Sequence, residues 1–301
     1  MTELQEKIIT LKGQKKALIL AHYYQSMDIQ AIADHVCDSY EMARRARDAK
    51  EELLVICGVH FMAESAKILN PLKTVLFPAP GAGCPMADMI VPEDIINLRK
   101  LHPEAAVVCY VNTSAAAKAA SDVCCTSSSA EKIVRALPEK KIIFVPDRNL
   151  GAFIASKVPE KEIILFDGCC PAHDCVSEKD VRAAKEAYPG AKLLVHPECR
   201  EEVLRHADYI GSTAGIIKAA LDSDAGEFII GTEYGIVEHL AKLAPEKRYY
   251  PLKSGFICPD MKKIRLSDVL QSLEKGVHEI KLAPEEIEAA KQSLERMVQL
   301  G

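Results

Sequence analysis

The sequence lacks several features that would place it in a common class of protein. It has no tryptophan, no uninterrupted apolar run of about eighteen residues, and no Cys-x-x-Cys pair among its 11 cysteines. The missing apolar run excludes a transmembrane helix, and the missing cysteine pairs argue against a closed structural zinc site. The amino end has scattered charges instead of the basic-then-apolar order of a signal peptide. We therefore expect a cytoplasmic chain without membrane contact, in a reducing compartment where disulfides are rare.

The sequence also lacks a large excess of charge of either sign. The chain has 38 Lys and Arg against 43 Asp and Glu, and no basic stripe indicates nucleic acid as a partner. A hydrophobic content of 49% excludes disorder, and 301 residues predict about two domains by length alone. Without disulfides, the cysteines either pack as small buried side chains or bind a metal.

Nine short runs rich in Val, Ile, Leu or Phe alternate with segments that carry Ala, Leu, Glu, Lys and Arg at helical spacing. This alternation predicts a parallel α/β architecture. The expected strands are 17–22, 53–57, 74–77, 106–111, 141–145, 163–166, 193–196, 227–231 and 249–252. Helices are expected between them, as at 39–50, 63–69, 116–120 and 235–243, and at the two ends, 4–12 and 284–300.

The nine strands form three groups of three, and each third strand leads into a cysteine followed by proline. Only Cys84, Cys170 and Cys258 precede proline, and they lie 86 and 88 residues apart. The span from the first strand to this cysteine is 66, 63 or 65 residues. The repeat predicts three homologous, Rossmann-like αβα units with parallel sheets around a pseudo-three-fold axis. The expected units are 1–84 with the terminal helix 284–301, 85–170 and 171–283.

Polar residues follow the first strand of each group at matching positions. His22, Asn112 and His196 stand at or just beyond its end. The segments ADHVCDSYE, ASDVCCTSS and HADYIGSTA share an aspartate near their start and lead to a hydroxyl before a helix. The hydroxyl residues are Ser39, Ser127, Ser212 and Thr213. They suit helix caps and anion-binding helix starts equally well, and we expect them to meet the Cys-Pro turns at the carboxyl ends of the strands.

Three cysteines from separate turns suit a soft metal and leave one coordination position open. A [4Fe–4S] cluster on three cysteines keeps one iron free to act as a Lewis acid. Spacing alone does not separate such a cluster from zinc on the same cysteines, or from three structural cysteines at strand ends. The remaining cysteines are expected to pack: Cys37, Cys57, Cys109, Cys124, Cys125, Cys169, Cys175 and Cys199.

Nine segments, in order across nearly the whole chain, resemble the quinolinate synthase (NadA) family. They are AHYYQ (21–25), CDSYEMA (37–43), YVNT (110–113), CTSS (125–128), GCCPAH (168–173), HPEC (196–199), GSTAG (211–215), GTEYGI (231–236) and CPDMKKI (258–264). The resemblance implies three homologous αβα domains around one [4Fe–4S] cluster per chain, held by Cys84, Cys170 and Cys258. Some family members carry a Cys-x-x-Cys near the third ligand, proposed as a redox switch; Cys258 lacks that partner, so no such regulation is expected.

The resemblance also implies an activity in de novo NAD biosynthesis. The enzyme would be a transferase that condenses iminoaspartate with dihydroxyacetone phosphate to quinolinate, releasing phosphate and two waters. L-Aspartate oxidase or aspartate dehydrogenase would supply the unstable iminoaspartate. A zinc-dependent hydrolase with three cysteine ligands and a non-enzymatic metal-binding protein of the same architecture are the alternatives.

Roles for individual residues follow from the same resemblance. Tyr24, His196 and Glu198 are implied to move protons, which suits a histidine near neutral pH and a phenol donor. The implied substrate-binding residues are His22, Ser39, Tyr110, Asn112, Ser127, His196, Glu198, Ser212 and Thr213. His173 is expected near the cluster without ligating it, and Glu233 behind the site. Lys262 and Lys263 are expected to be surface charges.

Overall fold

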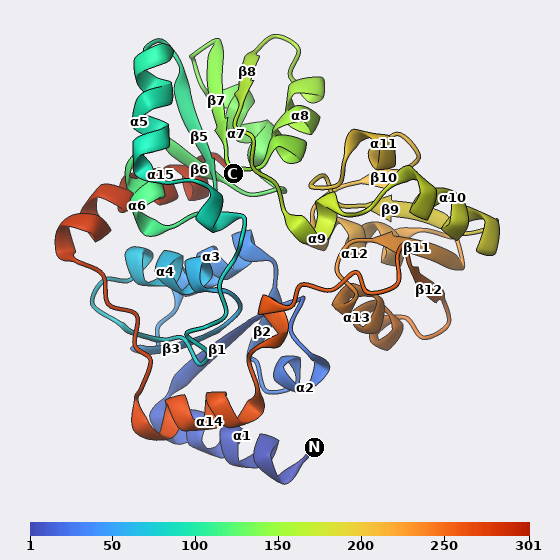
Figure 1. Cartoon of the computed structure of the whole chain (residues 1–301). Coiled ribbons are helices and arrows are strands. Elements are labelled where there is room, and N and C mark those ends of the chain that lie inside the picture. The colour runs from blue at the N-terminus through green and yellow to red at the C-terminus, as the bar shows by residue number, and fades with distance from the viewer.

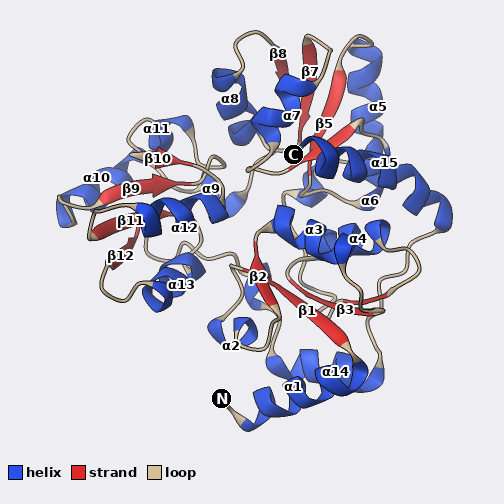
Figure 2. Cartoon of the chain, turned by 180° about the vertical axis from the view of Figure 1, so that it is seen from behind, coloured by secondary structure: helices blue, strands red, loops and turns tan.

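Three separate parallel sheets organise the chain, and the computed structural model describes all 301 residues (Figure 1). Each sheet has four strands, in the orders β2-β1-β3-β4, β6-β5-β7-β8 and β10-β9-β11-β12. Helices flank every sheet, so the predicted architecture of three αβα units is confirmed. The three units form three lobes around a common centre (Figures 1 and 2).

The first sheet lies near the amino end. Its elements are α1 (Glu3–Lys15), β1 (Ala17–His22), α2 (Met27–Gln30), β2 (His35–Cys37), α3 (Ser39–Asp48), β3 (Leu53–Cys57), α4 (His60–Leu69) and β4 (Thr74–Leu76). A short helical turn, η1 (Ala87–Met89), follows it. The second sheet repeats the pattern with α5 (Pro92–Leu101), β5 (Ala106–Tyr110), α6 (Ala115–Ala119), β6 (Val123–Cys125), α7 (Ala130–Ala136), β7 (Lys141–Val145), α8 (Arg148–Lys157) and β8 (Glu162–Leu165).

The third sheet repeats it again. Its elements are α9 (Pro171–Asp174), α10 (Glu178–Ala187), β9 (Lys192–Val195), α11 (Glu201–Leu204), β10 (Tyr209–Ile210), α12 (Thr213–Asp222), β11 (Glu227–Gly231), α13 (Gly235–Leu243) and β12 (Arg248–Pro251). A second helical turn, η2 (Asp260–Lys262), and the helices α14 (Leu266–Lys275) and α15 (Pro284–Leu300) complete the chain. All nine expected strands are present within one residue of the predicted ends.

Each sheet also has an edge strand that the sequence pattern missed. β2, β6 and β10 are only two or three residues long, so they leave no apolar run in the sequence. Each pairs in parallel with the first strand of its unit. These edge strands lie in the three segments whose shared aspartate was visible in the sequence.

The shared aspartate fastens each edge strand to the first strand. The Asp34 carboxylate accepts a hydrogen bond from the Ile19 N–H at 2.8 Å, and the Asp34 N–H donates to the Ile19 carbonyl at 2.9 Å. Asp122 and Asp208 make the same pair of bonds to the first strands of their own units, with carboxylate distances of 2.7 Å. The three units therefore repeat one local structure, down to the same side-chain contact.

The buried residues form two hydrophobic cores of unequal size. The first strands are apolar and buried on both faces, as expected for parallel sheets covered by helices. One core of 75 buried residues runs through the first two units and one face of the third sheet, whereas a second core of 11 residues lies within the third unit alone. The third unit thus keeps a core of its own beside the shared one.

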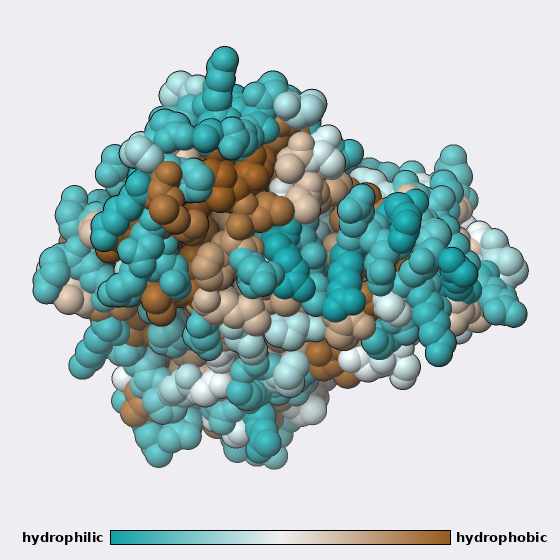
Figure 3. Space-filling view, turned by 45° about the horizontal axis from the view of Figure 1, so that its top comes forward, coloured by the Kyte–Doolittle hydropathy of each residue, from teal (hydrophilic) through white to brown (hydrophobic).

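The last two helices return to earlier parts of the chain. α14 packs on α1, and α15 packs on α4, α6 and β6, so α15 joins the first two units (Figure 2). The Ser293 hydroxyl of α15 donates to the Lys118 carbonyl at 2.9 Å. None of the helices combines the length and apolar character needed to cross a membrane. The surface in Figure 3 is largely hydrophilic, with an apolar region over the second unit.

Candidate active site

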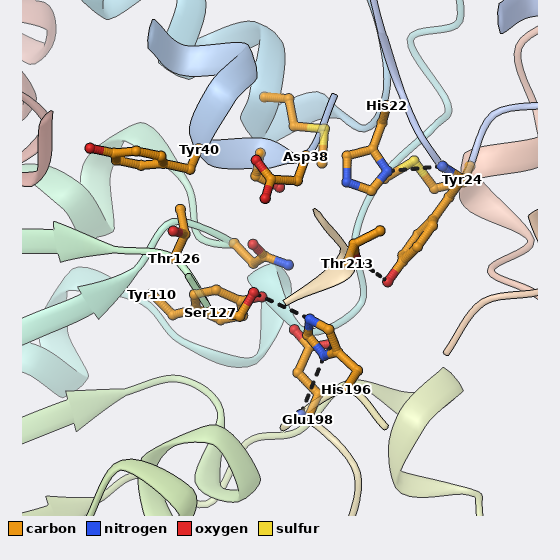
Figure 4. A pocket seen from close by; sticks show the side chains of 14 residues that line it. His22, Tyr24, Asp38, Tyr40, Tyr110, Thr126, Ser127, His196, Glu198 and Thr213 are labelled. Carbon is orange, nitrogen blue, oxygen red and sulfur yellow. Dashed lines mark hydrogen bonds and ion pairs between the residues drawn. The ribbon is translucent and has the colours of Figure 1, made fainter. Parts of the chain in front are cut away.

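A small cavity of about 50 Å³ lies where the carboxyl ends of β1, β5 and β9 meet (Figure 4). All three units contribute to it. Its lining residues are His22, Tyr24, Asp38, Ser39, Tyr40, Met62, Tyr110, Asn112, Thr126, Ser127, His196, Glu198, Thr213 and Met261. The structure therefore brings together every substrate-binding and proton-transfer residue named from the sequence except Ser212.

Strand register shows which lining residues are equivalent. His22 pairs with Cys37 and Tyr110 with Cys125, and His196 directly follows the matching pair of the third sheet. His22, Tyr110 and His196 are thus the same position in three units. The lining residues two positions further on are Tyr24, Asn112 and Glu198. The sequence comparison matched His22 with Asn112, and that match was wrong by two residues because β5 ends at Tyr110.

The repeat also shows which of the hydroxyl residues line the cavity and which cap a helix. Ser39, Ser127 and Thr213 are equivalent and line the cavity. Ser212 instead caps α12, where its hydroxyl accepts from the Gly215 N–H at 3.2 Å. The equivalent Asp38 caps α3 in the same manner. Of the adjacent pair in the third unit, Thr213 faces the cavity and Ser212 starts the helix.

Sequence reasoning missed five lining residues. They are Asp38, Tyr40, Met62, Thr126 and Met261. Asp38 and Thr126 directly precede hydroxyls that were found, so the repeat could have revealed them. Met62 and Met261 gave no signal, because a methionine is an ordinary core residue in sequence.

Tyr24 and His22 form one contact group. The two rings meet edge to face with centroids 4.5 Å apart, and the Tyr24 N–H donates to His22 Nδ1 at 3.1 Å. Burial lowers the pKa of His22 to about 3. The imidazole is therefore neutral and, since Nδ1 accepts, carries its proton on Nε2. Burial raises the pKa of Tyr24 well above its ordinary value, so the phenol is protonated.

Glu198 lies between two histidines. One carboxylate oxygen, Oε2, is 2.9 Å from His173 Nδ1 and 3.6 Å from His196 Nδ1. Burial alone would raise the pKa of Glu198, but the adjacent histidines outweigh it and hold the pKa below its ordinary value. Glu198 is therefore an ionised carboxylate in a buried position, the reverse of what burial alone would produce.

His196 complements this carboxylate. Its Nδ1 accepts from the Glu198 N–H at 3.4 Å, and its Nε2 lies 3.2 Å from the Ser127 hydroxyl (Figure 4). Burial lowers the pKa of His196 to about 4, so this ring is neutral too. The ring thus contacts the third unit through one nitrogen and the second unit through the other.

Two buried oxygens in the site have no partner. Asn112 Oδ1 and Glu198 Oε1 are shielded from solvent without a hydrogen bond. A buried acceptor without a donor costs about 1–3 kcal/mol, so such atoms point to a missing ligand. The cavity therefore offers these two acceptors together with hydroxyl and imidazole donors, and suits a polar molecule that both donates and accepts hydrogen bonds.

The three Cys-Pro turns meet beside the cavity. The Cys84 thiol lies close enough to Cys170 and Cys258 to interact electrostatically with both. Each cysteine precedes a short helical turn, η1, α9 or η2. Burial raises the pKa of all three thiols, and backbone N–H groups of the following turn lower it in part.

These turns fit a thiolate-bound metal group. Three thiols from three units interact electrostatically and none is in a disulfide, and backbone N–H groups of the following turns lower the pKa of each, which favours the thiolate that binds a metal. Cys170 also joins this group to the cavity. Its Sγ is 3.2 Å from His173 Nδ1, and the ligand atoms of Cys170, His173 and Glu198 all lie within 4.8 Å of one another.

The predictions for the remaining cysteines and for two lysines are confirmed only in part. Cys37, Cys57, Cys109, Cys124, Cys125 and Cys199 are buried as predicted, and Cys169 is half-buried. Cys175 is exposed, so its assignment to packing was wrong. Lys262 is not a surface charge either, because it pairs with the buried Glu233 at 3.0 Å. Lys263 is half exposed and pairs with Asp260.

Comparison with known proteins identifies relatives of the whole chain. Residues 6–299 match the family described as "Quinolinate synthetase A protein". A quinolinate synthase of Caldicellulosiruptor bescii is 50% identical over 298 residues, covering 99% of this chain and 98% of the relative. A quinolinate synthase of Caldicellulosiruptor saccharolyticus is 51% identical, covering 99% of both chains. Quinolinate synthase 2 of Methanosarcina acetivorans is 46% identical, covering 99% of this chain and 96% of that protein.

The neutral, buried His22 predicts an acid-sensitive fold. Its folded-state pKa of about 3 lies below the ordinary value of 6.5, so its contribution to stability is present above pH 6.5 and lost as the pH falls toward 3. Between pH 7.5 and 5.0 this histidine alone lowers the free energy of unfolding by about 2 kcal/mol. Urea unfolding of metal-free wild type and His22→Gln at both pH values measures it. An equal pH dependence in the two proteins contradicts the prediction.

Proposed function

The chain belongs to the quinolinate synthetase A family, and on that premise we propose that it condenses iminoaspartate with dihydroxyacetone phosphate to quinolinate, releasing phosphate and two waters. As a quinolinate synthase, it acts in NAD biosynthesis. The observation that carries the proposal is the cavity itself, where equivalent polar positions of three units face one another beside three Cys-Pro turns. The residues lining that cavity supply what this condensation needs.

We assign substrate binding to neutral hydrogen-bond donors in the cavity. Both substrates are anions, and the chain meets them with imidazole N–H groups and hydroxyls rather than a basic surface. Ser39 and Thr213 stand in the first turns of α3 and α12, where free backbone N–H groups also favour an anion. Ser127, already 3.2 Å from His196 Nε2, supplies the third equivalent hydroxyl. These groups bind the carboxylate and phosphate oxygens.

Proton transfer falls to Glu198 and Tyr24. The environment lowers the pKa of Glu198 and raises that of Tyr24, so one is a base and the other an acid at neutral pH. The unpartnered Glu198 Oε1 is free to accept a proton from bound substrate. The Tyr24 phenol donates to an oxygen that leaves as water. His196, in contact with Glu198, completes the set of proton carriers.

Cys84, Cys170 and Cys258 would hold the [4Fe–4S] cluster of this family, which when bound supplies a Lewis-acidic iron for a substrate oxygen. The chain's own contribution is to present three sulfurs on turns from three units, one of which, that of Cys170, lies within 4.8 Å of ligand atoms of Glu198 and His173. His173 holds Cys170 and Glu198 together through one ring nitrogen.

The supply of iminoaspartate requires a second enzyme. Iminoaspartate hydrolyses readily, so an oxidase or dehydrogenase acting on L-aspartate has to produce it close to the time of use. We propose L-aspartate oxidase or aspartate dehydrogenase as that functional partner.

The proposal is tested with anaerobically purified wild type. Incubation with dihydroxyacetone phosphate and freshly generated iminoaspartate is expected to yield quinolinate, measured by chromatography. About four irons and four acid-labile sulfides per chain should accompany a broad visible absorption. Zinc without sulfide, together with no quinolinate, would support a zinc-dependent hydrolase instead.

The adjacent cysteines provide a matched pair for the cluster ligands. Cys170→Ser should lose cluster and activity because Cys170 supplies one of only three sulfurs. Cys169→Ser should keep its colour, because the Cys169 backbone, and not its thiol, makes the local contact to Met89. Iron and sulfide analysis of both variants decides the point, and full cluster retention in Cys170→Ser overturns the ligand assignment.

Glu198→Gln tests the base. The amide keeps the shape of the side chain but has no negative charge to accept a proton, so turnover should fall by about 10²–10⁴-fold. Quinolinate binding, followed by thermal shift, should persist with cluster content unchanged. Turnover close to that of wild type would argue against a role for Glu198 in proton transfer.

A further inference from the structure

Each sheet ends on one side in an outer strand, and β4, β8 and β12 are equivalent in the three units. Thr74, Glu162 and Arg248 begin these strands, and each donates its N–H to the residue just before the inner neighbouring strand. In a parallel pair, alternate residues of the outer strand bond to the inner one, and the residues between them point their N–H and carbonyl groups outward. The outward positions are therefore the second and fourth residues from the start of each outer strand.

Two of these outer edges are closed. In the first unit, the Val75 carbonyl accepts from the Ile280 N–H at 2.8 Å. The next outward group, the Phe77 N–H, donates to the His278 carbonyl at 2.9 Å, so a segment between α14 and α15 covers this edge. In the third unit the equivalent of Phe77 is Pro251, which has no N–H to offer. Covering and proline are two ways in which proteins keep an outer strand from pairing with another chain.

The edge of β8 has neither protection. Its outward positions are Ile163 and Leu165, whose backbone N–H and carbonyl groups point away from β7 and have no other partner. Leu165 is 42% exposed, and Ile163 and Ile164 are only partly buried. β8 thus presents apolar side chains beside unpaired backbone groups, which is the combination that pairs with a further strand.

The sequence of this edge is suited to pairing with a second copy of itself. The segment from Lys161 to Asp167 reads KEIILFD, with its apolar residues around Ile164 and opposite charges at its two ends. An antiparallel pair centred on Ile164 places Ile163 opposite Leu165 of the other copy, which matches their outward backbone groups. The same register places Lys161 opposite Asp167. The Lys161 ammonium bonds only to main-chain carbonyls of its own chain, and the Asp167 side chain is 94% exposed.

We propose that β8 is a self-association edge, on which two copies of this chain pair antiparallel about Ile164 and join their second sheets into one continuous sheet. The N–H groups of Ile163 and Leu165 in each copy donate to the carbonyls of the same two residues in the other. The contact is symmetric, so assembly stops at the dimer. A stable interface buries about 1,200–2,000 Å² in total, more than two short strands supply, so the dimer dissociates on dilution. No residue of β8 lines the cavity, and the proposal does not depend on the proposed function.

Sedimentation velocity of the wild-type chain tests the association itself. Over a range of about 1–100 μM we expect a species of twice the 33.0 kDa chain mass to grow with concentration. A monomer alone over the whole range overturns the proposal.

Leu165→Pro gives β8 the residue that the third unit carries at the equivalent outward position. The ladder to β7 stays intact, because the N–H that proline removes points away from it. Two hydrogen bonds are lost in each dimer, so we expect its dissociation constant to rise by about tenfold or more. A folded Leu165→Pro variant with the dissociation constant of wild type places the interface elsewhere and overturns the proposal.

Two exposed aspartates give a matched pair for the register, and they keep it testable where Leu165→Pro fails to fold. Asp167→Lys brings lysines opposite one another at both ends of the paired strands, so the dimer should weaken, and less so at high salt. Asp48→Lys makes the same change at another exposed aspartate beside an arginine, in α3, and should leave association unchanged. Equal effects of the two variants contradict the pairing of Lys161 with Asp167.

Hydrogen exchange locates the contact on the chain. The amides of Ile163 and Leu165 are free in the monomer and bonded in the dimer, so a peptide covering 162–167 should exchange more slowly as the concentration rises. Peptides covering β4 and β12 should not change. Association without slower exchange in β8 overturns the proposal, and neither measurement depends on whether quinolinate forms.

Discussion

The convergence of three parallel sheets on one point is the constraint on which this structure depends. A parallel strand presents the polar groups after its carboxyl end at one edge, and here three such edges face one another. Because little water enters so small a space, the polar groups from each unit have to satisfy those of the others. Thr213 and Thr232 satisfy Tyr24, Ser127 contacts His196, and His173 pairs with Glu198.

Three copies of one scaffold produce an asymmetric site. The position that follows the first strand holds His22, Tyr110 or His196, on backbones that the same aspartate contact fixes in each unit. Because the three backbones are alike, the equivalent residues hold similar positions around the cavity. Their different side chains give these positions different proton affinities. Burial keeps both imidazoles neutral, whereas Glu198, beside two of the histidines, keeps its negative charge.

Most of the fold was predictable because most of its elements leave a local pattern in the sequence. Nine strands are long enough to appear as apolar runs, and the Cys-Pro pairs give the length of the repeat. β2, β6 and β10 are too short for any periodicity, and the register of Asn112 was misjudged because apolar character continues past the end of β5 to Val111. The contacts of Thr232 and Lys262 with the first unit could not be predicted, since no local pattern records them.

The distribution of the three thiols along the chain has a consequence for how the protein matures. Cys84 and Cys170 emerge during synthesis long before Cys258, and the third sheet must form before its turn takes its place. The three sulfurs exist together only once residue 258 has been made, so a metal group held by all three would be acquired after the third unit has formed. Such a group would bridge all three units, and the free energy of its binding would add to the cohesion of a unit that otherwise keeps a core of its own.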